Sequence, residues 1–199
     1  MYRKVLGLFL VMMITVLTCY TVRAAISEFS ADFTMTDAKG KVATGKTFIK
    51  ENKIRQESVA EGQTAITILR MDKKVSWTLM PENKQYMEIA IPFDPSHPVE
   101  EAGPEFEYET QTIGRETING YDCEMIQYTY KKKKYGTLVQ WISQKLNFAV
   151  KYQTKDSKGK VISTMEYKNI KTGGVADSLF EIPDGYTKLG ISFKLPGMK

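Results

Sequence analysis

Few residues of this chain are of a type that supports nucleophilic or metal-centred chemistry. His97 is the single histidine, and Cys123 is the single cysteine outside the first 24 residues, which hold Cys19. His97 lies in a proline-rich stretch, residues 92–98, with the period of neither a helix nor a strand. A catalytic base needs a nucleophile held by a rigid scaffold, and the sequence near His97 supplies none. One histidine and one cysteine also fall short of an ordinary zinc site, so we expect no metal.

The remaining candidates for catalysis are weaker. Asp122 and Glu124 alternate onto one strand face, but no partner for acid–base work accompanies them. Gly173-Gly174 follows a strand without the lysine and hydroxyl residue of a phosphate loop. Tyr121 and Met125 flank Cys123 on its strand face, which favours a buried and inert thiol. The sequence therefore predicts no enzyme and no cofactor.

Methionine and aromatic side chains offer a different chemistry, the binding of an apolar guest. Methionine is flexible and polarizable and is over-used where a surface accepts ligands of variable shape. The same side chains could equally pack an ordinary core. The candidates for contact with a guest are Phe33, Met35, Met71, Trp77, Met87, Met125, Trp141, Phe148, Tyr152 and Met165.

Four consecutive lysines, Lys131, Lys132, Lys133 and Lys134, lie between Tyr130 and Tyr135. Such a run is typical of the solvated tip of a hairpin. The alternative is contact with anionic lipid head groups, worth ~1 kcal/mol per lysine near such a surface.

The elements that must position these side chains are strands. Apolar and polar residues alternate from Phe29 onward, and Asn119-Gly120 is a strong hairpin signal. The expected strands cover residues 29–36, 42–50, 54–60, 64–71, 74–80, 85–91, 109–117, 121–131, 136–142, 148–155 and 160–170.

The sequence leaves room for helical structure in two places only, because strand-like alternation covers most of the rest. The stretch 92–108 could hold a long loop or a short helix, and residues 176–180 one helical turn. A sheet of this width accumulates twist and must curl or close. We expect a mainly β fold, α+β at most: a strongly curved antiparallel sheet of about eleven strands forming an incomplete barrel, with few short helices.

The N-terminus has the layout of a secretory signal peptide. A basic start precedes an apolar run from Val5 to Thr18, and Val22-Arg23-Ala24 ends it with small residues. We expect cleavage after Ala24, which leaves residues 25–199 as a single exported domain. Lipid anchoring through Cys19 is the alternative. Loss of Arg3, Lys4 and Arg23 lowers the net charge from +5 by three, to +2, which argues against a nucleic-acid partner.

Several motifs resemble periplasmic lipoprotein carriers of the LolA type and uncharacterised outer-membrane lipoprotein-sorting-like proteins. Residues 28–41 look like the opening strand of these carriers and its Asp-x-x-Gly-Lys turn, and residues 72–77 resemble their Asp-Gly-x-x-x-Trp strand. Residues 116–124 and 179–183 are similar to the sorting-like proteins. The resemblance implies a half-barrel whose hydrophobic cavity binds acyl chains, with Arg55 near the cavity mouth.

Two hypotheses follow. The first is a non-enzymatic, monomeric periplasmic carrier or sensor of lipid or of an acylated lipoprotein. The second is a structural or adaptor module of the cell envelope, with a core filled by its own side chains and a protein partner. A ligand carrier should retain apolar material after purification, whereas an adaptor should capture a partner.

Overall fold

The computed structural model describes residues 28–60, 62–91 and 107–190. This part of the chain forms a single sheet of twelve strands. The strands are β1 (Phe29–Asp37), β2 (Val42–Lys50), β3 (Lys53–Ala60), β4 (Gln63–Arg70), β5 (Val75–Met80), β6 (Gln85–Ala90), β7 (Tyr108–Ile118), β8 (Tyr121–Tyr130), β9 (Thr137–Ser143), β10 (Phe148–Lys155), β11 (Val161–Thr172) and β12 (Thr187–Lys188). Three 3-10 turns accompany them in these ranges: η2 (Pro81–Asn83), η4 (Lys133–Tyr135) and η5 (Asp177–Phe180).

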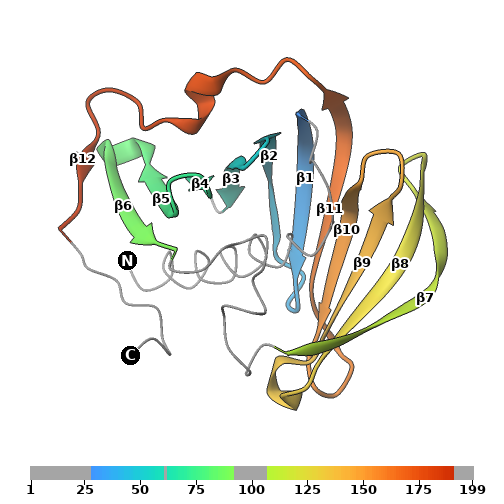
Figure 1. The fold of residues 1–199 in the computed structure, drawn as a ribbon. Coiled ribbons are helices and arrows are strands. Elements are labelled where there is room, and N and C mark those ends of the chain that lie inside the picture. The colour runs from blue at the N-terminus through green and yellow to red at the C-terminus, as the bar shows by residue number, and fades with distance from the viewer. Residues whose placement is uncertain (1–27, 61, 92–106, 191–199) are drawn as a thin grey trace.

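The sheet joins two antiparallel meanders. Its strand order is β12-β6-β5-β4-β3-β2-β1-β11-β10-β9-β8-β7, so β1 and β11 form the seam between the strands β1–β6 and β7–β11. The sheet curves strongly, and its end strands β12 and β7 do not pair with each other (Figure 1). The predicted curved, incomplete barrel is therefore confirmed.

All eleven expected strands are present, with ends that differ from the prediction by at most two residues. Asn119 and Gly120 adopt positive φ values of 51° and 82°, as the predicted hairpin turn requires. The helical turn expected within 176–180 is η5. The sequence did not indicate β12, a two-residue strand that pairs in parallel with β6.

The register defines two faces of the sheet. Residues opposite each other in an antiparallel pair share a face. One face, which we call the Phe33 face, carries alternate residues of β1 and their partners in β2 and β11: Ala31, Phe33, Met35, Gly45, Thr47, Met165 and Tyr167. The other, the Trp77 face, carries the row Phe48, Arg55, Ile68, Trp77 and Glu88 across β2–β6.

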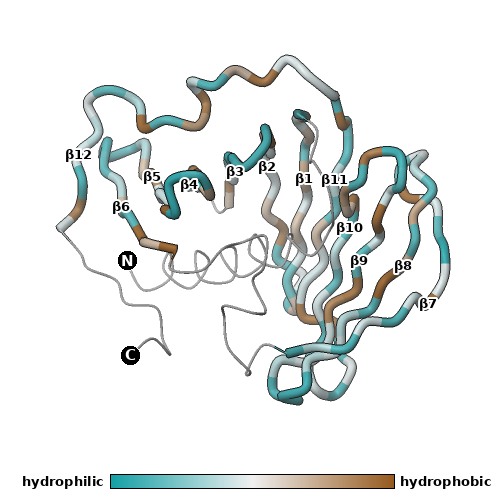
Figure 2. Tube along the Cα trace, in the orientation of Figure 1, coloured by the Kyte–Doolittle hydropathy of each residue, from teal (hydrophilic) through white to brown (hydrophobic). Residues whose placement is uncertain are grey.

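The alternation that builds these faces is visible along the strands, where hydrophobic and hydrophilic residues follow one another (Figure 2). The chain between β11 and β12 runs along the outer side of the curved sheet, over β2–β5 (Figure 1). The predicted signal peptide, residues 1–24, and the segment 92–106 with His97 lie outside the described residues.

Candidate functional site

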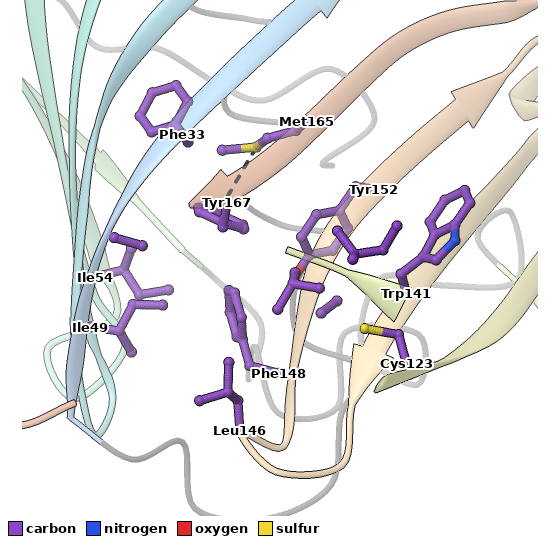
Figure 3. Close-up of a cluster of buried hydrophobic side chains, with 14 of the residues drawn as sticks. Phe33, Ile49, Ile54, Cys123, Trp141, Leu146, Phe148, Tyr152, Met165 and Tyr167 are labelled. Atoms are coloured by element: carbon purple, nitrogen blue, oxygen red, sulfur yellow. Dashed lines mark hydrogen bonds between the residues drawn. The ribbon is translucent and has the colours of Figure 1, made fainter. Parts of the chain in front are cut away.

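The Phe33 face carries the larger of two apolar clusters. Phe33 and Met165 are 3% and 4% exposed, and the cluster draws on β1–β4 and β7–β11. Its rings meet at steep angles, and the centroids of Phe29 and Phe148 are 4.7 Å apart. Those of Phe148 and Tyr167, which Figure 3 labels, are 5.2 Å apart. Such pairs contribute about 0.5–1.5 kcal/mol each beyond the area they bury.

Gly45 shapes this cluster because it lies opposite Phe33 in the register. A Cβ added to Gly45 would meet the Phe33 ring at 2.7 Å and the backbone oxygen of Glu57 at 1.8 Å. The ring therefore packs onto the bare backbone of β2. Glycine at this position allows the close approach of the aromatic side chain to the strand.

A row of polar side chains crosses the same face beside the apolar cluster. The register aligns Thr47 of β2 with Gln56 of β3, then with Thr67 of β4 and Thr78 of β5. All four are at most 8% exposed. Thr47 Oγ1 and Gln56 Oε1 find no hydrogen-bond partner among the groups that the structure describes. Buried polar atoms are nearly always paired, so this pair is a candidate for contact with a ligand.

The Trp77 face has its own apolar cluster, and the chain covers it. Phe180 of η5 is 0% exposed and packs with Ile68, Trp77 and Leu79. Arg55 donates through one guanidinium nitrogen to the Leu179 carbonyl oxygen at 2.9 Å. This segment, residues 175–186, we call the strap.

Ion pairs fasten the strap at both ends of η5. The lysine ammonium groups of Lys50 and Lys53 lie 2.9 Å and 2.6 Å from the Asp177 carboxylate, and their hydrogen bonds lower its pKa to about 2. Arg70 donates to the Phe180 carbonyl oxygen, to Glu181 and to Asp72. The bond from Arg70 lowers the pKa of Asp72, and Arg70 itself is held charged by a raised pKa.

The structure distributes the predicted guest-binding residues over both faces. Six belong to the larger apolar cluster, and two more pack against it while partly buried: Phe33, Met35, Trp141, Phe148, Tyr152 and Met165, then Met71 and Met125. Within that cluster the register pairs Trp141 with Met125 and with Lys151, in the row of Glu166 and Thr34 rather than in the row of Phe33. Met87 is half-buried and shares the face of Thr78. Trp77 and Arg55 lie on the opposite face, against the strap. The structure does not bring these two together with the others.

A cleft of about 490 Å³ lies on the Trp77-face side of the seam, lined by Ser30, Asp32, Lys46, Phe48 and the β-bulge residues of β11. Within it, Asp32 is 3.7 Å from the Lys46 ammonium and accepts a hydrogen bond from Asn169 at 2.8 Å. Such a polar notch does not suit an acyl chain, and it is separate from the Phe33 face.

The four lysines from Lys131 to Lys134 are exposed at the β8–β9 hairpin, as the pattern indicated. Lys131 pairs with Glu107, and the Lys134 ammonium lies 4.6 Å from the centroid of the Tyr135 ring. Cys123 is fully buried, and burial raises the pKa of its thiol. The expected burial of this thiol is confirmed.

Within the described ranges, no three His, Cys, Asp or Glu side chains gather as metal ligands would. No helix in that part of the chain is long and apolar enough to cross a membrane.

The sequence analysis did not indicate Thr47 and Gln56, because alternation along a strand does not show which of its faces points inward. The tight turn between β2 and β3 fixes the register of the two strands, and counting residues back from that turn pairs Thr47 with Gln56. The strap residues gave a helical-turn signal, but nothing in the sequence indicated which face they cover.

Solved structures resemble this fold at low sequence identity. An uncharacterized conserved protein from Thermus thermophilus superposes with a TM-score of 0.62 at 11% identity, covering 82% of this chain and 90% of that one. MucB superposes with a TM-score of 0.56 at 13% identity, covering 85% of this chain and 62% of that one. The chain thus spans less than two thirds of MucB.

The LolA superfamily protein NE2245 from Nitrosomonas europaea also matches, with a TM-score of 0.38 at 13% identity, over 82% of this chain and 94% of that one. The likeness in fold rests on the first two structures, and the open, curved sheet is the incomplete barrel that the sequence predicted.

No curated protein matches the chain. Residues 30–147, more than half of the chain and most of the sheet, match the family described as "Domain of unknown function (DUF4412)". The protein belongs to the DUF4412 family.

Proposed function

We propose that the protein binds an amphiphile, a lipid or the acyl chains of a lipoprotein, on the Phe33 face, as a non-catalytic carrier or sensor in the cell envelope. The observation that carries the proposal is the placement of two unpaired polar atoms, Thr47 Oγ1 and Gln56 Oε1, beside the apolar cluster on one face. A surface of this kind suits a guest with a polar group next to hydrocarbon.

The apolar part of the site is built for hydrocarbon. Phe33, Met35, Met165 and the rings around Tyr167 present carbon and sulfur without a fixed polar pattern. Each buried methylene of a guest contributes ~0.8 kcal/mol of affinity, so a single acyl chain supplies most of the binding free energy. Methionines accommodate chains of differing length and unsaturation.

The polar part of the site selects what is attached to the chain. The Thr47 hydroxyl can donate or accept, and the Gln56 carboxamide can do both. An amide or ester linkage next to an acyl chain would satisfy both side chains. Burial of the two side chains would make these hydrogen bonds stronger than they are in water.

The setting in the envelope rests on the N-terminal layout, which predicts export and cleavage after Ala24. The solved structures that this fold resembles include MucB, which has been crystallised with MucA(peri). This supports a place for the fold among envelope proteins.

The test is mass spectrometry of an organic extract from protein purified without detergent from an envelope fraction. We expect phospholipid or acyl chain in a stoichiometric amount. A variant with Thr47→Val and Gln56→Leu should retain less of the amide- or ester-bearing lipid. Thr34→Val, one strand away on the Trp77 face, is the control and should retain the wild-type amount. A protein that carries no lipid and gains no stability from added lipid would contradict the proposal.

The alternative is an adaptor module, and one feature of the sheet favours it. β7 is an end strand of the sheet, and most of its residues are exposed. An exposed strand edge can pair with an extended segment of a partner. The complex of MucB with MucA shows that a protein of similar fold takes a protein partner. Capture of one partner, lost when Thr112 is replaced by proline, would support this function.

A further inference from the structure

Two hairpins of the sheet end in the same turn. Asp37-Ala38-Lys39-Gly40-Lys41-Val42 joins β1 to β2, and Asp156-Ser157-Lys158-Gly159-Lys160-Val161 joins β10 to β11. In each turn one aspartate oxygen accepts the backbone N–H groups of both lysines, at 2.8 Å and 2.9 Å. The glycines adopt φ values of 79° and 81°. The aspartates are thus committed to the turn, which they hold through backbone N–H groups.

These two turns and the lysine run of residues 131–134 are neighbours. The three hairpins β2–β1, β11–β10 and β9–β8 are consecutive in the sheet, and antiparallel pairing places their tips at one end (Figure 1). Strands lie about 4.8 Å apart, so adjacent tips lie about 10 Å apart.

Glycine holds two of the tips in contact. A Cβ added to Gly136, at the end of the β8–β9 tip, would lie 2.0 Å from the Lys155 carbonyl oxygen and 2.8 Å from the Asp156 carbonyl carbon. The seam fixes the third tip, since Asp37 pairs with Ser163. The three tips therefore form a continuous edge, which we call the lysine rim.

The lysine rim combines positive charge with exposed apolar side chains. Its lysines are Lys39, Lys41, Lys131, Lys132, Lys133, Lys134, Lys158 and Lys160, all exposed. Val42, Val161 and Ile162, beside the twin turns, are 56%, 37% and 39% exposed. Three carboxylates at the rim have partners: Asp37 and Asp156 within their turns, and Glu107 with Lys131.

We propose that the lysine rim docks the protein on an anionic phospholipid bilayer. The cations of the rim are lysines throughout; arginine, which recognises fixed carboxylates and phosphates through two parallel hydrogen bonds, is absent from the three tips. Lysine acts as a point charge on a flexible stem, which suits mobile head groups better than a structured partner. The exposed valines and isoleucine lie where a docked surface would bury them shallowly in the interface.

This proposal extends the membrane contact expected for the run 131–134 to two further hairpins, and it stands without a lipid guest on the Phe33 face. The experiment is co-sedimentation of the purified protein with phosphatidylcholine vesicles, with and without one third phosphatidylglycerol. We expect binding to the phosphatidylglycerol vesicles alone, and its loss at high salt, because the Debye length shrinks.

The variant Lys39→Gln, Lys158→Gln, Lys160→Gln preserves both turns, since those use backbone N–H groups. Each lysine near an anionic surface contributes about fivefold to binding, so the triple variant should bind about a hundredfold more weakly. The matched control is Lys74→Gln, Lys145→Gln, Lys171→Gln, which removes the same charge from exposed sites at the opposite end of the sheet.

The control should bind the vesicles as the wild type does. Equal weakening in both triple variants would show a response to net charge and overturn the proposal. Failure of the wild type to bind phosphatidylglycerol vesicles would overturn it as well. Circular dichroism of both variants identifies loss of fold, and Val161→Ser, which leaves the lysines in place, should still weaken binding if the rim enters the interface.

Discussion

The two faces of the sheet differ in what closes them. On the Trp77 face the chain supplies its own cover: Phe180 fills the cluster, and Arg70 and Asp177 fasten the strap across it. On the Phe33 face the described cluster residues come from the strands and from residues next to them in the chain, and Thr47 and Gln56 carry unpaired polar atoms.

From this difference we expect the Trp77 face to contribute stability and the Phe33 face to contribute binding. Where the strap covers the Trp77 face, Arg55, Arg70 and Asp177 have partners and the Phe180 ring is buried, as in an ordinary core. The Phe33 face departs from that rule in two buried polar atoms, and such departures concentrate at functional sites. Four predictions test the contrast, in order of decreasing effect.

The largest effect is expected at the strap. Phe180→Ala removes a fully buried ring and should lower the free energy of unfolding by about 3–5 kcal/mol. Urea denaturation with and without added lipid measures the loss, which should be the same in both conditions. A loss below about 1 kcal/mol would show that the strap does not close the Trp77 face.

Gly45→Ala tests the packing of Phe33 against β2. The added methyl group would collide with the Glu57 backbone oxygen and the Phe33 ring, so we expect a loss of about 1–3 kcal/mol or more. Thermal unfolding measures it. Gly190→Ala, where no atom lies within 4 Å of the added Cβ, is the control and should leave the midpoint unchanged. Equal stability of both variants would remove the basis for the close contact.

Removal of the unpaired polar atoms should raise the free energy of unfolding, whereas the two changes above lower it. Thr47→Val with Gln56→Leu takes away buried groups without partners, so the ligand-free protein should gain about 1 kcal/mol of stability. Gln140→Leu is the contrast: Gln140 is also fully buried but does have a partner, so its loss should cost about 1–3 kcal/mol. A destabilised double variant would mean that both side chains are satisfied in solution.

The smallest effect is the pH dependence of the strap. The pKa of Asp177 is lowered from 3.8 to about 2 by its lysine partners, so its contribution is present above about pH 4 and is lost as the pH falls through 2. Burial alone would raise the pKa of Glu181, but the bonds from Arg70 and Lys73 outweigh it, so Glu181 acts in the same direction.

The unfolding midpoint should therefore fall on acidification below about pH 4, and less steeply in Asp177→Asn. Glu82→Gln, an exposed change away from the strap, should follow the wild-type curve. An unchanged slope in Asp177→Asn would show that its ion pairs are not maintained in solution, as is common for exposed pairs.

The sheet was predictable because its signals are local. Alternation in Phe29–Asp37 and the turn at Asn119-Gly120 depend on neighbouring residues alone, and both are present in the structure. β12 was not predictable, because a pair of residues has no period and its pairing with β6 depends on the path of the strap.

The composition of the candidate site was less predictable. Alternation along a strand separates the two faces of that strand, but it does not show which face of the next strand lies on the same side of the sheet. Trp77 and Phe33 belong to similar apolar patterns, yet the register across β1–β5 places them on opposite faces. Likewise Gln56 looks like a solvent-facing residue in its strand, and only its pairing with Thr47 and Thr67 reveals an inward row.

The position of the seam has a consequence for how the chain reaches this structure. All other antiparallel pairs join strands that follow each other in sequence, whereas the seam pairs Phe29 with Thr172. Loop-closure entropy grows with the length of chain enclosed, and pairings distant in sequence form slowly. We expect the meanders β1–β6 and β7–β11 to form first and the seam to form last. Until that step each half exposes an edge, β1 or β11, so the rate of joining sets how long newly made chains remain open to aggregation.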